Sequence, residues 1–349
     1  MLDSRNNCFI KKKNCKLKEP KFLNTYKTDI NDQFKELLNL DKSEFYFEPI
    51  SDYLIIKNST KMPKRIRSSI FLEILNGLEK DYNVYTKLAC GIEYLHEFSL
   101  VHDDIQDKDE IRRGNSTLWK EFGTEKSILL GNIIKIISDT ITSDYNSKIK
   151  ASTAKEVIKT FNTVCINMIE GQYLDIMYED ESYISLENYL YMISRKTGAL
   201  MSLSFYLPSI LHESEKQDND LFKTLGDIFG LLFQISDDML GIWGDPSDTG
   251  KSNFSDFENN KKTYPILLAK EKFSKKDKKI FNELSLNDKN IEGKNITDLM
   301  DSYNIKSIIK SDCLKYIECS RDLISKTNLQ QTSKKNLNEL FDYVIERVK

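Results

Sequence analysis

No proline occurs between Pro63 and Pro208, and this feature limits the architectures open to the chain. Proline removes a backbone N–H donor and breaks helices, whereas turn-rich β-sheet proteins use proline and glycine freely. The whole chain of 349 residues contains only 13 glycines and 6 prolines. The sequence therefore predicts an all-α fold built from long helices.

Three amphipathic segments support this prediction, and each leads into residues that can bind a ligand. Apolar residues recur at spacings of three and four from Val84 to Phe98, directly before the sequence 102–107, which is His-Asp-Asp-Ile-Gln-Asp. A second such segment, residues 157–169, leads into Gly171-Gln172. A third, residues 221–232, leads into Gln234 and two further aspartates before a Gly/Pro-containing stretch ends it. Two aspartate clusters are therefore expected at the ends of long helices.

The overall composition is typical of a globular protein with a small net charge. Residues 1–25 are polar and are expected to form a flexible lead, followed by one helical domain over residues 26–349. The 51 basic and 54 acidic residues provide no field that would hold nucleic acid. We expect no membrane-spanning segment and no signal peptide, and six cysteines without CxxC spacing favour a reduced, cytoplasmic setting.

The first aspartate cluster has the spacing of a cation site. Asp103 and Asp107 lie four residues apart, so on a helix their carboxylates project from one face and can bind the same hard cations. Taken alone, this pattern is also explained by an exposed acidic helix end. The second cluster, Asp237-Asp238, is open to the same two interpretations.

Basic residues near both clusters favour a site for phosphate groups. Arg112-Arg113-Gly114 follows the first cluster closely, and guanidinium groups bind phosphate oxygens through paired hydrogen bonds. Lys251 and Lys261 follow the second cluster. Further basic groups stand upstream of the first cluster and between the two: Lys64-Arg65-Ile66-Arg67 and Arg195-Lys196. Together they predict a pocket for one or two diphosphates bridged by magnesium, which prefers phosphate oxygens as ligands.

From Met62 to Leu268 the order of these motifs resembles that of the trans-type (head-to-tail) isoprenyl diphosphate synthases. Residues 64–67 are similar to a basic segment of that family, and His96 stands seven residues before Asp103, as a family histidine does. Gly171-Gln172, Lys196-Thr197-Gly198, Phe233-Gln234 and Gly250-Lys251 follow in family order. The resemblance implies a single large helical bundle of the isoprenoid synthase type, with a central substrate cavity.

The resemblance also implies a magnesium-dependent prenyltransferase that couples isopentenyl diphosphate to an allylic prenyl diphosphate. Three magnesium ions are expected on Asp103, Asp107 and Asp237. The diphosphate of the allylic substrate would be bound by Arg112, Lys196, Thr197, Gln234, Lys251 and Lys261. Isopentenyl diphosphate would be bound by Lys64, Arg67, His96 and Arg113. The expected product is short, farnesyl or geranylgeranyl diphosphate, and the expected assembly is a homodimer.

Several positions depart from the family pattern. Pro63 and Ser68 replace a glycine and a proline that usually flank the basic segment. Asn132 stands where many members have an acidic residue, and Gly241 occupies the fifth position of the second cluster, where many have a third aspartate. The second cluster is therefore expected to be the place where this chain differs from its relatives.

Two residues before the first cluster are candidates for setting product length. Phe98 and Ser99 precede Asp103 by five and four residues, about one helical turn, and an aromatic side chain there would form the floor of the cavity. An ordinary core position explains Phe98 equally well.

Two alternatives to chain elongation follow from the same motifs. A terpene cyclase on the same scaffold would ionise a prenyl diphosphate but would not need isopentenyl diphosphate, and the presence of Lys64, Arg67 and His96 argues against it. A regulatory subunit of a heteromeric synthase would be inert alone. Pro63 and Gly241 support that interpretation, and the retained aspartates weaken it.

Overall fold

The computed structural model describes residues 19–39, 63–144, 149–244, 261–286 and 293–348, which are almost entirely helical. The first helices are α1 (Lys21–Thr25), α2 (Lys27–Asn39) and α4 (Ile66–Gly77), followed by a 3-10 turn at Tyr82–Tyr85. The central helices are α5 (Thr86–Gln106), α6 (Leu118–Phe122), α7 (Thr124–Asp144), α8 (Ala151–Glu179), α9 (Leu186–Ile193), α10 (Ala199–His212) and α11 (Lys216–Trp243). The last helices are α14 (Tyr264–Lys272), α15 (Lys275–Leu286), α16 (Gly293–Ser302), α17 (Ile305–Lys326) and α18 (Gln331–Glu346).

Short irregular elements interrupt this pattern at two places. A π-helical turn, Ser194–Gly198, joins α9 to α10. Strands β1 (Ile111–Arg112) and β2 (Asn115–Ser116) form a small antiparallel hairpin after α5. Both elements lie within motifs singled out in the sequence, and π-turns are frequent at functional sites.

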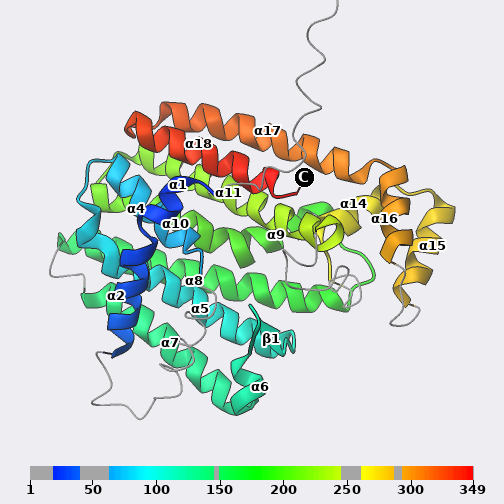
Figure 1. The fold of residues 1–349 in the computed structure, drawn as a ribbon, viewed down its shortest axis with the longest axis horizontal. Coiled ribbons are helices and arrows are strands. Elements are labelled where there is room, and N and C mark those ends of the chain that lie inside the picture. Colours follow the sequence, from blue (N-terminus) through cyan, green and yellow to red (C-terminus); the bar gives the residue numbers. More distant parts are fainter. Residues whose placement is uncertain (1–18, 40–62, 145–148, 245–260, 287–292, 349) are drawn as a thin grey trace, which may run out of the picture.

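The helices are stacked in layers, as Figure 1 shows. Helices α17 and α18 lie along one side of the molecule and α7 along the opposite side, with α11, α10, α8 and α5 between them. Helix α5 packs against α7, and α10 packs against α11, α8 and α4. Of the helices that carry the sequence motifs, α5 packs against α8, and α10 connects α8 to α11.

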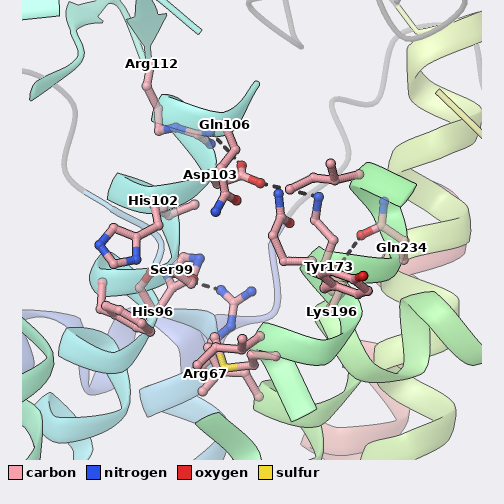
Figure 2. Close-up of a pocket in the computed structure, with 18 of the residues that line it drawn as sticks. Arg67, His96, Ser99, His102, Asp103, Gln106, Arg112, Tyr173, Lys196 and Gln234 are labelled. Atoms are coloured by element: carbon pink, nitrogen blue, oxygen red, sulfur yellow. Dashed lines mark hydrogen bonds and ion pairs between the residues drawn. The ribbon is translucent and has the colours of Figure 1, made fainter. Parts of the chain in front are cut away.

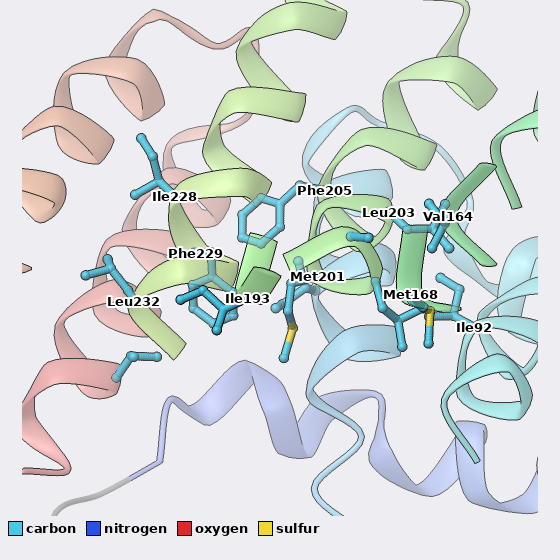
Figure 3. Close-up of a cluster of buried hydrophobic side chains, with 14 of the residues drawn as sticks. Ile92, Val164, Met168, Ile193, Met201, Leu203, Phe205, Ile228, Phe229 and Leu232 are labelled. Atoms are coloured by element: carbon cyan, nitrogen blue, oxygen red, sulfur yellow. The ribbon is translucent and has the colours of Figure 1, made fainter. Parts of the chain in front are cut away.

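The core consists of apolar side chains contributed by these same helices (Figure 3). Ile92 from α5, Met168 from α8, Phe205 from α10 and Phe229 from α11 are all buried, and the Phe205 and Phe229 ring centroids lie 5.4 Å apart. Burying one such side chain stabilises the fold by about 1.5–3 kcal/mol. The packed core thus holds the motif-bearing helices in fixed relation to one another.

The predicted all-α class is confirmed, and the three amphipathic segments form α5, α8 and α11. The expected boundary at residue 25 differs from the structure. Helix α1 begins at Lys21, and both Phe22 and Leu23 are buried, so part of the segment expected as a flexible lead belongs to the folded domain. Residues 1–18 of that lead lie outside the described residues. Among the helices that the structure describes, none is long and apolar enough to cross a bilayer.

Candidate active site

Most of the residues predicted to bind substrate line one cavity of about 820 Å³. Figure 2 shows Asp103, His102 and His96 on α5 facing Lys196 and Gln234 on the other side. The predicted residues that line the cavity are Arg67, His96, Phe98, Ser99, Asp103, Arg112, Arg113, Lys196, Thr197, Gln234 and Asp237. Segments far apart in the sequence thus converge on one space, as a substrate cavity requires.

The first cluster lies at the end of α5, as predicted, and is surrounded by cations. Asp107 caps the helix by donating its backbone N–H to the carbonyl oxygen of Asp103. Arg112 Nη2 lies 3.0 Å from Asp103 Oδ2, and Arg112 Nε donates to the buried Asp104. Burial alone would raise the pKa of Asp103, but Lys196 and Arg112 outweigh it and lower that pKa. Asp103 is therefore held as a carboxylate in the absence of any metal.

The hairpin after α5 explains the sequence Arg112-Arg113-Gly114. Arg113 has φ 54° and Gly114 has φ 83°, so the two central residues of the turn both adopt left-handed conformations. Tight hairpins favour this turn type, and glycine accommodates it without a steric cost. The hairpin directs Arg112 back onto the aspartates, while Arg113 lies 3.7 Å from the buried Glu97 carboxylate and lines the cavity.

Two lysines bridge the first cluster to α8. Lys196 Nζ lies 3.3 Å from Asp103 Oδ1 and 2.5 Å from Asp175 Oδ2. Lys261 Nζ lies 2.9 Å from Asp107 Oδ1 and 3.4 Å from the same Asp175 oxygen. Burial lowers the pKa of both ammonium groups, but the surrounding carboxylates outweigh it and raise both values. Both lysines therefore carry a positive charge inside the protein.

The close approach of the π-turn to α8 places Lys196 within reach of these acids. A Cβ atom on Gly171 would lie 2.1 Å from the backbone nitrogen of Lys196, a contact that no side chain tolerates. Only glycine allows the two backbones to approach this closely. Asp175 stands one turn further along α8 and meets the Lys196 ammonium. The glycine of the Gly171-Gln172 motif is therefore required for the close packing of the π-turn against α8. This packing in turn brings Lys196 to Asp175.

The two acids of the second cluster have different environments. Asp238 is buried and satisfied: it accepts hydrogen bonds from the Tyr189 hydroxyl, the Tyr264 backbone N–H and Gln234 Nε2. Asp237 instead lines the cavity and pairs with Arg347, just after α18. Thr197 Oγ1 donates to Gln234 Oε1 over 2.7 Å, which links the π-turn to α11. Asp237 is therefore the acid of this cluster that is available to a ligand.

The predicted residues for isopentenyl diphosphate fall into two groups. Arg67 Nη1 lies 3.5 Å from His96 Nδ1, both residues line the cavity, and the buried Nε of Arg67 has no hydrogen-bond acceptor. Lys64 is oriented differently: its ammonium pairs with Glu19 at 2.6 Å and donates to the Tyr343 hydroxyl at 3.1 Å. Arg67 and His96 therefore lie together at the cavity, whereas Lys64 is not among the described residues that line it.

Arg65, within the same basic segment, has a structural role. Its buried guanidinium pairs with Glu93 at 3.1 Å and donates to Asn31 Oδ1 at 3.0 Å. Its backbone has φ 51° at the start of α4, and these contacts offset the cost of that conformation. Ser68, which departs from the family's proline, donates its backbone N–H and its hydroxyl to Glu93. A proline could not donate the first of these bonds.

Of the other departures, Asn132 lines the cavity, whereas Pro63 and Gly241 are not among the described residues that line it. Pro63 is buried directly before Lys64, and Asn132 lines the cavity from the exposed side of α7. Gly241 lies on the last turn of α11, which ends at Trp243. Lys251 falls outside the described residues, so its predicted role remains a prediction.

Two residues that sequence reasoning did not assign are part of this arrangement. Asp175 joins the two lysines, and its only sequence signal is its position one turn after Gly171. Arg347 pairs with Asp237 and lies 5.0 Å above the Phe233 ring. No motif marks Arg347, because its role depends on how α18 packs against α11.

The acids at the cavity fit a hard cation that takes further ligands from a substrate. Asp103 Oδ1 is buried, and the ammonium group of Lys196 lies 3.3 Å from it. Among the described residues, no group of three or more His, Cys, Asp or Glu side chains is arranged to hold a metal. Magnesium is commonly bound through one or two carboxylates together with phosphate oxygens and water. A few carboxylates beside several cations therefore suit a metal that arrives with a diphosphate.

Comparison with known proteins agrees with this geometry. The sequence model of the family described as polyprenyl synthetase matches residues 49–302. The chain belongs to the polyprenyl synthetase family. It is 30% identical over 318 residues to a geranylgeranyl pyrophosphate synthase of Geoglobus acetivorans, covering 91% of this chain and 96% of that protein. The chain is accordingly a prenyltransferase, and the predicted family and enzyme class are confirmed.

Other relatives confirm the fold and differ in their named products. A geranylfarnesyl diphosphate synthase of Aeropyrum pernix is 30% identical over 291 residues, covering 82% of this chain and 91% of that protein. The crystal structure of a geranylgeranyl pyrophosphate synthetase from Pyrococcus horikoshii superimposes with a TM-score of 0.83 at 25% identity, covering 94% of this chain and 98% of that one. These relatives are named as synthases of short prenyl chains. None of these names favours the cyclase alternative.

Proposed function

We propose that this prenyltransferase couples isopentenyl diphosphate to an allylic prenyl diphosphate in the cavity between α5, α8 and α11, in a magnesium-dependent reaction. The observation that carries the proposal is that acids from α5 and α11 and cations from the π-turn and the hairpin converge on one cavity. Asp103, Lys196 and Asp237 line the same space, together with apolar side chains such as Met168 and Leu200. The polar end suits a diphosphate, and the apolar part suits a hydrocarbon chain.

The allylic diphosphate is proposed to bind at the polar end of the cavity. Asp103, Asp107 and Asp237 would hold three magnesium ions, which supply positive charge to the leaving diphosphate. Arg112, Lys196, Lys261, Thr197 and Gln234 would bind or orient the phosphate oxygens, together with Lys251. Cations already held in a partly buried site stabilise developing negative charge without reorganising at the moment of reaction.

Isopentenyl diphosphate is proposed to bind beside it, next to Arg67, His96 and Arg113. The unpaired Nε of Arg67 supports this assignment because a buried guanidinium donor without an acceptor is costly. Lys64 would join this site by leaving Glu19. A diphosphate held here would bring its double bond toward the apolar part of the cavity.

The proposed reaction proceeds in three steps. The carbon–oxygen bond of the allylic diphosphate breaks, and the electron pair leaves with the diphosphate. The double bond of isopentenyl diphosphate then forms a new carbon–carbon bond with the allylic cation. A proton is finally lost, with the departing diphosphate as its acceptor, and a double bond is restored. An apolar lining excludes water that would otherwise capture the cation.

The length of the product is proposed to be limited by Phe98 and Ser99. Both line the cavity, and the Phe98 ring packs edge-on against His102 with 4.8 Å between centroids. Only 7% of Phe98 is exposed, so the ring is fixed in place. A fixed aromatic ring on the cavity wall supports a short product, farnesyl or geranylgeranyl diphosphate.

A homodimer is proposed from an apolar surface on α7 and α8. Large hydrophobic side chains are exposed along one stripe of α8 and one of α7, and the two helices pack together. The stripes comprise Ile166 and Met177 on α8, and Ile128, Leu129 and Ile136 on α7, while the exposed α8 residues Ile169, Tyr173 and Ile176 line the cavity. Apolar patches of this extent on a protein surface mark interaction sites. A second copy presenting the same two helices would cover them in a symmetric contact.

The test is incubation of the purified chain with magnesium, labelled isopentenyl diphosphate and dimethylallyl, geranyl or farnesyl diphosphate. Chain elongation predicts labelled prenyl diphosphates. Hydrocarbon released without label would indicate a cyclase. An inert chain that gains activity only with a partner would indicate a regulatory subunit, and either result would overturn the proposal.

A further inference from the structure

Asp175 occupies a position that the proposed chemistry does not use directly. It lies on α8, its side chain is only 9% exposed, and it is not among the described residues that line the cavity. One of its carboxylate oxygens, Oδ2, lies 2.5 Å from Lys196 Nζ and 3.4 Å from Lys261 Nζ. Two ammonium groups that come from distant parts of the chain thus share one oxygen atom.

Each of these lysines has a second acidic partner at the first cluster. Lys196 contacts Asp103 and Lys261 contacts Asp107, at 3.3 Å and 2.9 Å. In the proposed function, Asp103 and Asp107 are engaged by magnesium and diphosphate. The attraction between these aspartates and the lysines is then reduced, because the charge of each aspartate is balanced by a metal.

The two ammonium groups would repel one another once those partners are lost. Like charges this close in a partly buried site are unfavourable unless an opposite charge lies between them. Asp175 is the carboxylate that contacts both, whereas Glu179 contacts Lys261 and not Lys196 among the ion pairs of the described residues. Asp175 can therefore keep both groups in place with their remaining N–H donors free to meet phosphate oxygens.

We propose that Asp175 is a positioning residue that holds Lys196 and Lys261 side by side while the first cluster is engaged by a metal–diphosphate substrate. This inference rests on the proposed function. Asp175 does not touch the substrate: it acts through the two lysines. Its effect is on how tightly the diphosphate is bound and oriented, and Gly171 makes the arrangement possible by admitting the Lys196 backbone against α8.

The test is the affinity of the full-length protein for inorganic diphosphate in the presence of magnesium, measured by calorimetry. Asp175→Asn keeps the shape and removes the charge, and it is expected to weaken binding about tenfold, the loss of about one charge-assisted contact. The KM for the allylic substrate should rise with it, and Asp175→Glu should restore part of the affinity. Unchanged diphosphate affinity in Asp175→Asn would overturn the proposal.

Glu179→Gln is the matched control, because Glu179 pairs with Lys261 at 2.5 Å and has no ion pair with Lys196 among the described residues. Glu179→Gln should lower the affinity for diphosphate by less than about threefold, because the contacts of Lys196 are unchanged. A loss as large as that of Asp175→Asn would contradict a role that depends on both lysines.

A double variant tests the proposal even if Asp175→Asn alone does not fold. Lys261→Gln with Asp175→Asn removes one buried cation together with the buried anion. The diphosphate affinity of the double variant is compared with that of Lys261→Gln alone. It should be less than about threefold lower, because the Lys261 ammonium no longer repels Lys196 in either variant. A further tenfold loss would overturn the proposal. If the unaltered protein does not bind magnesium diphosphate at all, the proposed function itself fails.

Discussion

The guanidinium of Arg347 forms an ion pair with Asp237, although the two residues are 110 positions apart in the sequence. The same guanidinium lies 5.0 Å above the ring of Phe233, one helical turn before Asp237 on α11. Asp237 and Phe233 both line the cavity. Asp237, the cavity-lining acid of the second aspartate cluster, is therefore paired with a cation of the chain itself.

This pairing predicts that Arg347 competes with magnesium for Asp237. Arg347→Gln should lower the magnesium concentration needed for half-maximal activity about two- to fivefold, the range expected for a partly exposed ion pair. The measurement is initial rate against magnesium concentration. Arg321→Gln removes a comparable pair with Asp342, at 2.6 Å on the outer helices, and should leave the curve unchanged. A higher magnesium requirement in Arg347→Gln would show that the arginine assists the site.

The contact between Gly171 and the π-turn predicts a large effect of a single methyl group. In Gly171→Ala the new Cβ would meet the Lys196 backbone at 2.1 Å, so one of the two segments must move. The free energy of unfolding should fall by about 1–3 kcal/mol, and activity should fall further because Lys196 moves away from Asp103. Denaturant unfolding and initial rates measure the two effects. Asn162→Ala, at an exposed position of the same helix, should change neither.

Phe98 is predicted to limit the length of the product. Phe98→Ala should shift the product toward longer chains by at least one isoprene unit, because the cavity becomes deeper where the ring is removed. Chromatography of the dephosphorylated products measures the shift. Phe161→Ala removes an equally buried ring of α8 that does not line the cavity, and it controls for loss of core packing. If both variants give the same products as the unaltered chain, Phe98 is an ordinary core residue.

The apolar stripes on α7 and α8 predict that charges placed there prevent dimer formation. Ile136→Lys combined with Ile166→Lys should convert the protein to a monomer in sedimentation experiments, because each copy would bury two unpaired cations. Neither residue lines the cavity. Leu314→Lys introduces the same charge at an exposed position of α17 and should leave the assembly unchanged. A double variant that sediments like the unaltered chain would place the contact elsewhere.

The helices and the motif positions were predictable from the sequence because their signals are local. The apolar spacing from Leu88 to Phe98 indicates the buried face of α5, whereas Val84, the first residue of the pattern, is exposed in the preceding 3-10 turn. The spacing of Asp103 and Asp107 indicates a shared side at the end of the helix. The start of the folded domain was placed too late. Phe22 and Leu23 lie among polar neighbours, and only the packing of α1 against α4 reveals that they are buried.

The connections among the site residues could not be predicted, because they depend on how distant helices pack. Asp175 contacts Lys196 and Lys261 only because the π-turn and the segment before α14 both pack near α8 in the folded chain. Asp237 and Asp238 look equivalent in the sequence, yet one lines the cavity and the other is buried with three hydrogen-bond donors. The orientation of Lys64 toward Glu19 and Tyr343 depends likewise on the ends of the described chain meeting.

The measurement that tests the account most directly is the ratio of inorganic diphosphate released to labelled isopentenyl units incorporated, followed in one reaction with magnesium and an allylic primer. Coupling in this cavity predicts one diphosphate for every isopentenyl unit added, and almost no turnover in Asp103→Asn. Release of diphosphate without incorporation of label, or full activity in Asp103→Asn, would contradict it.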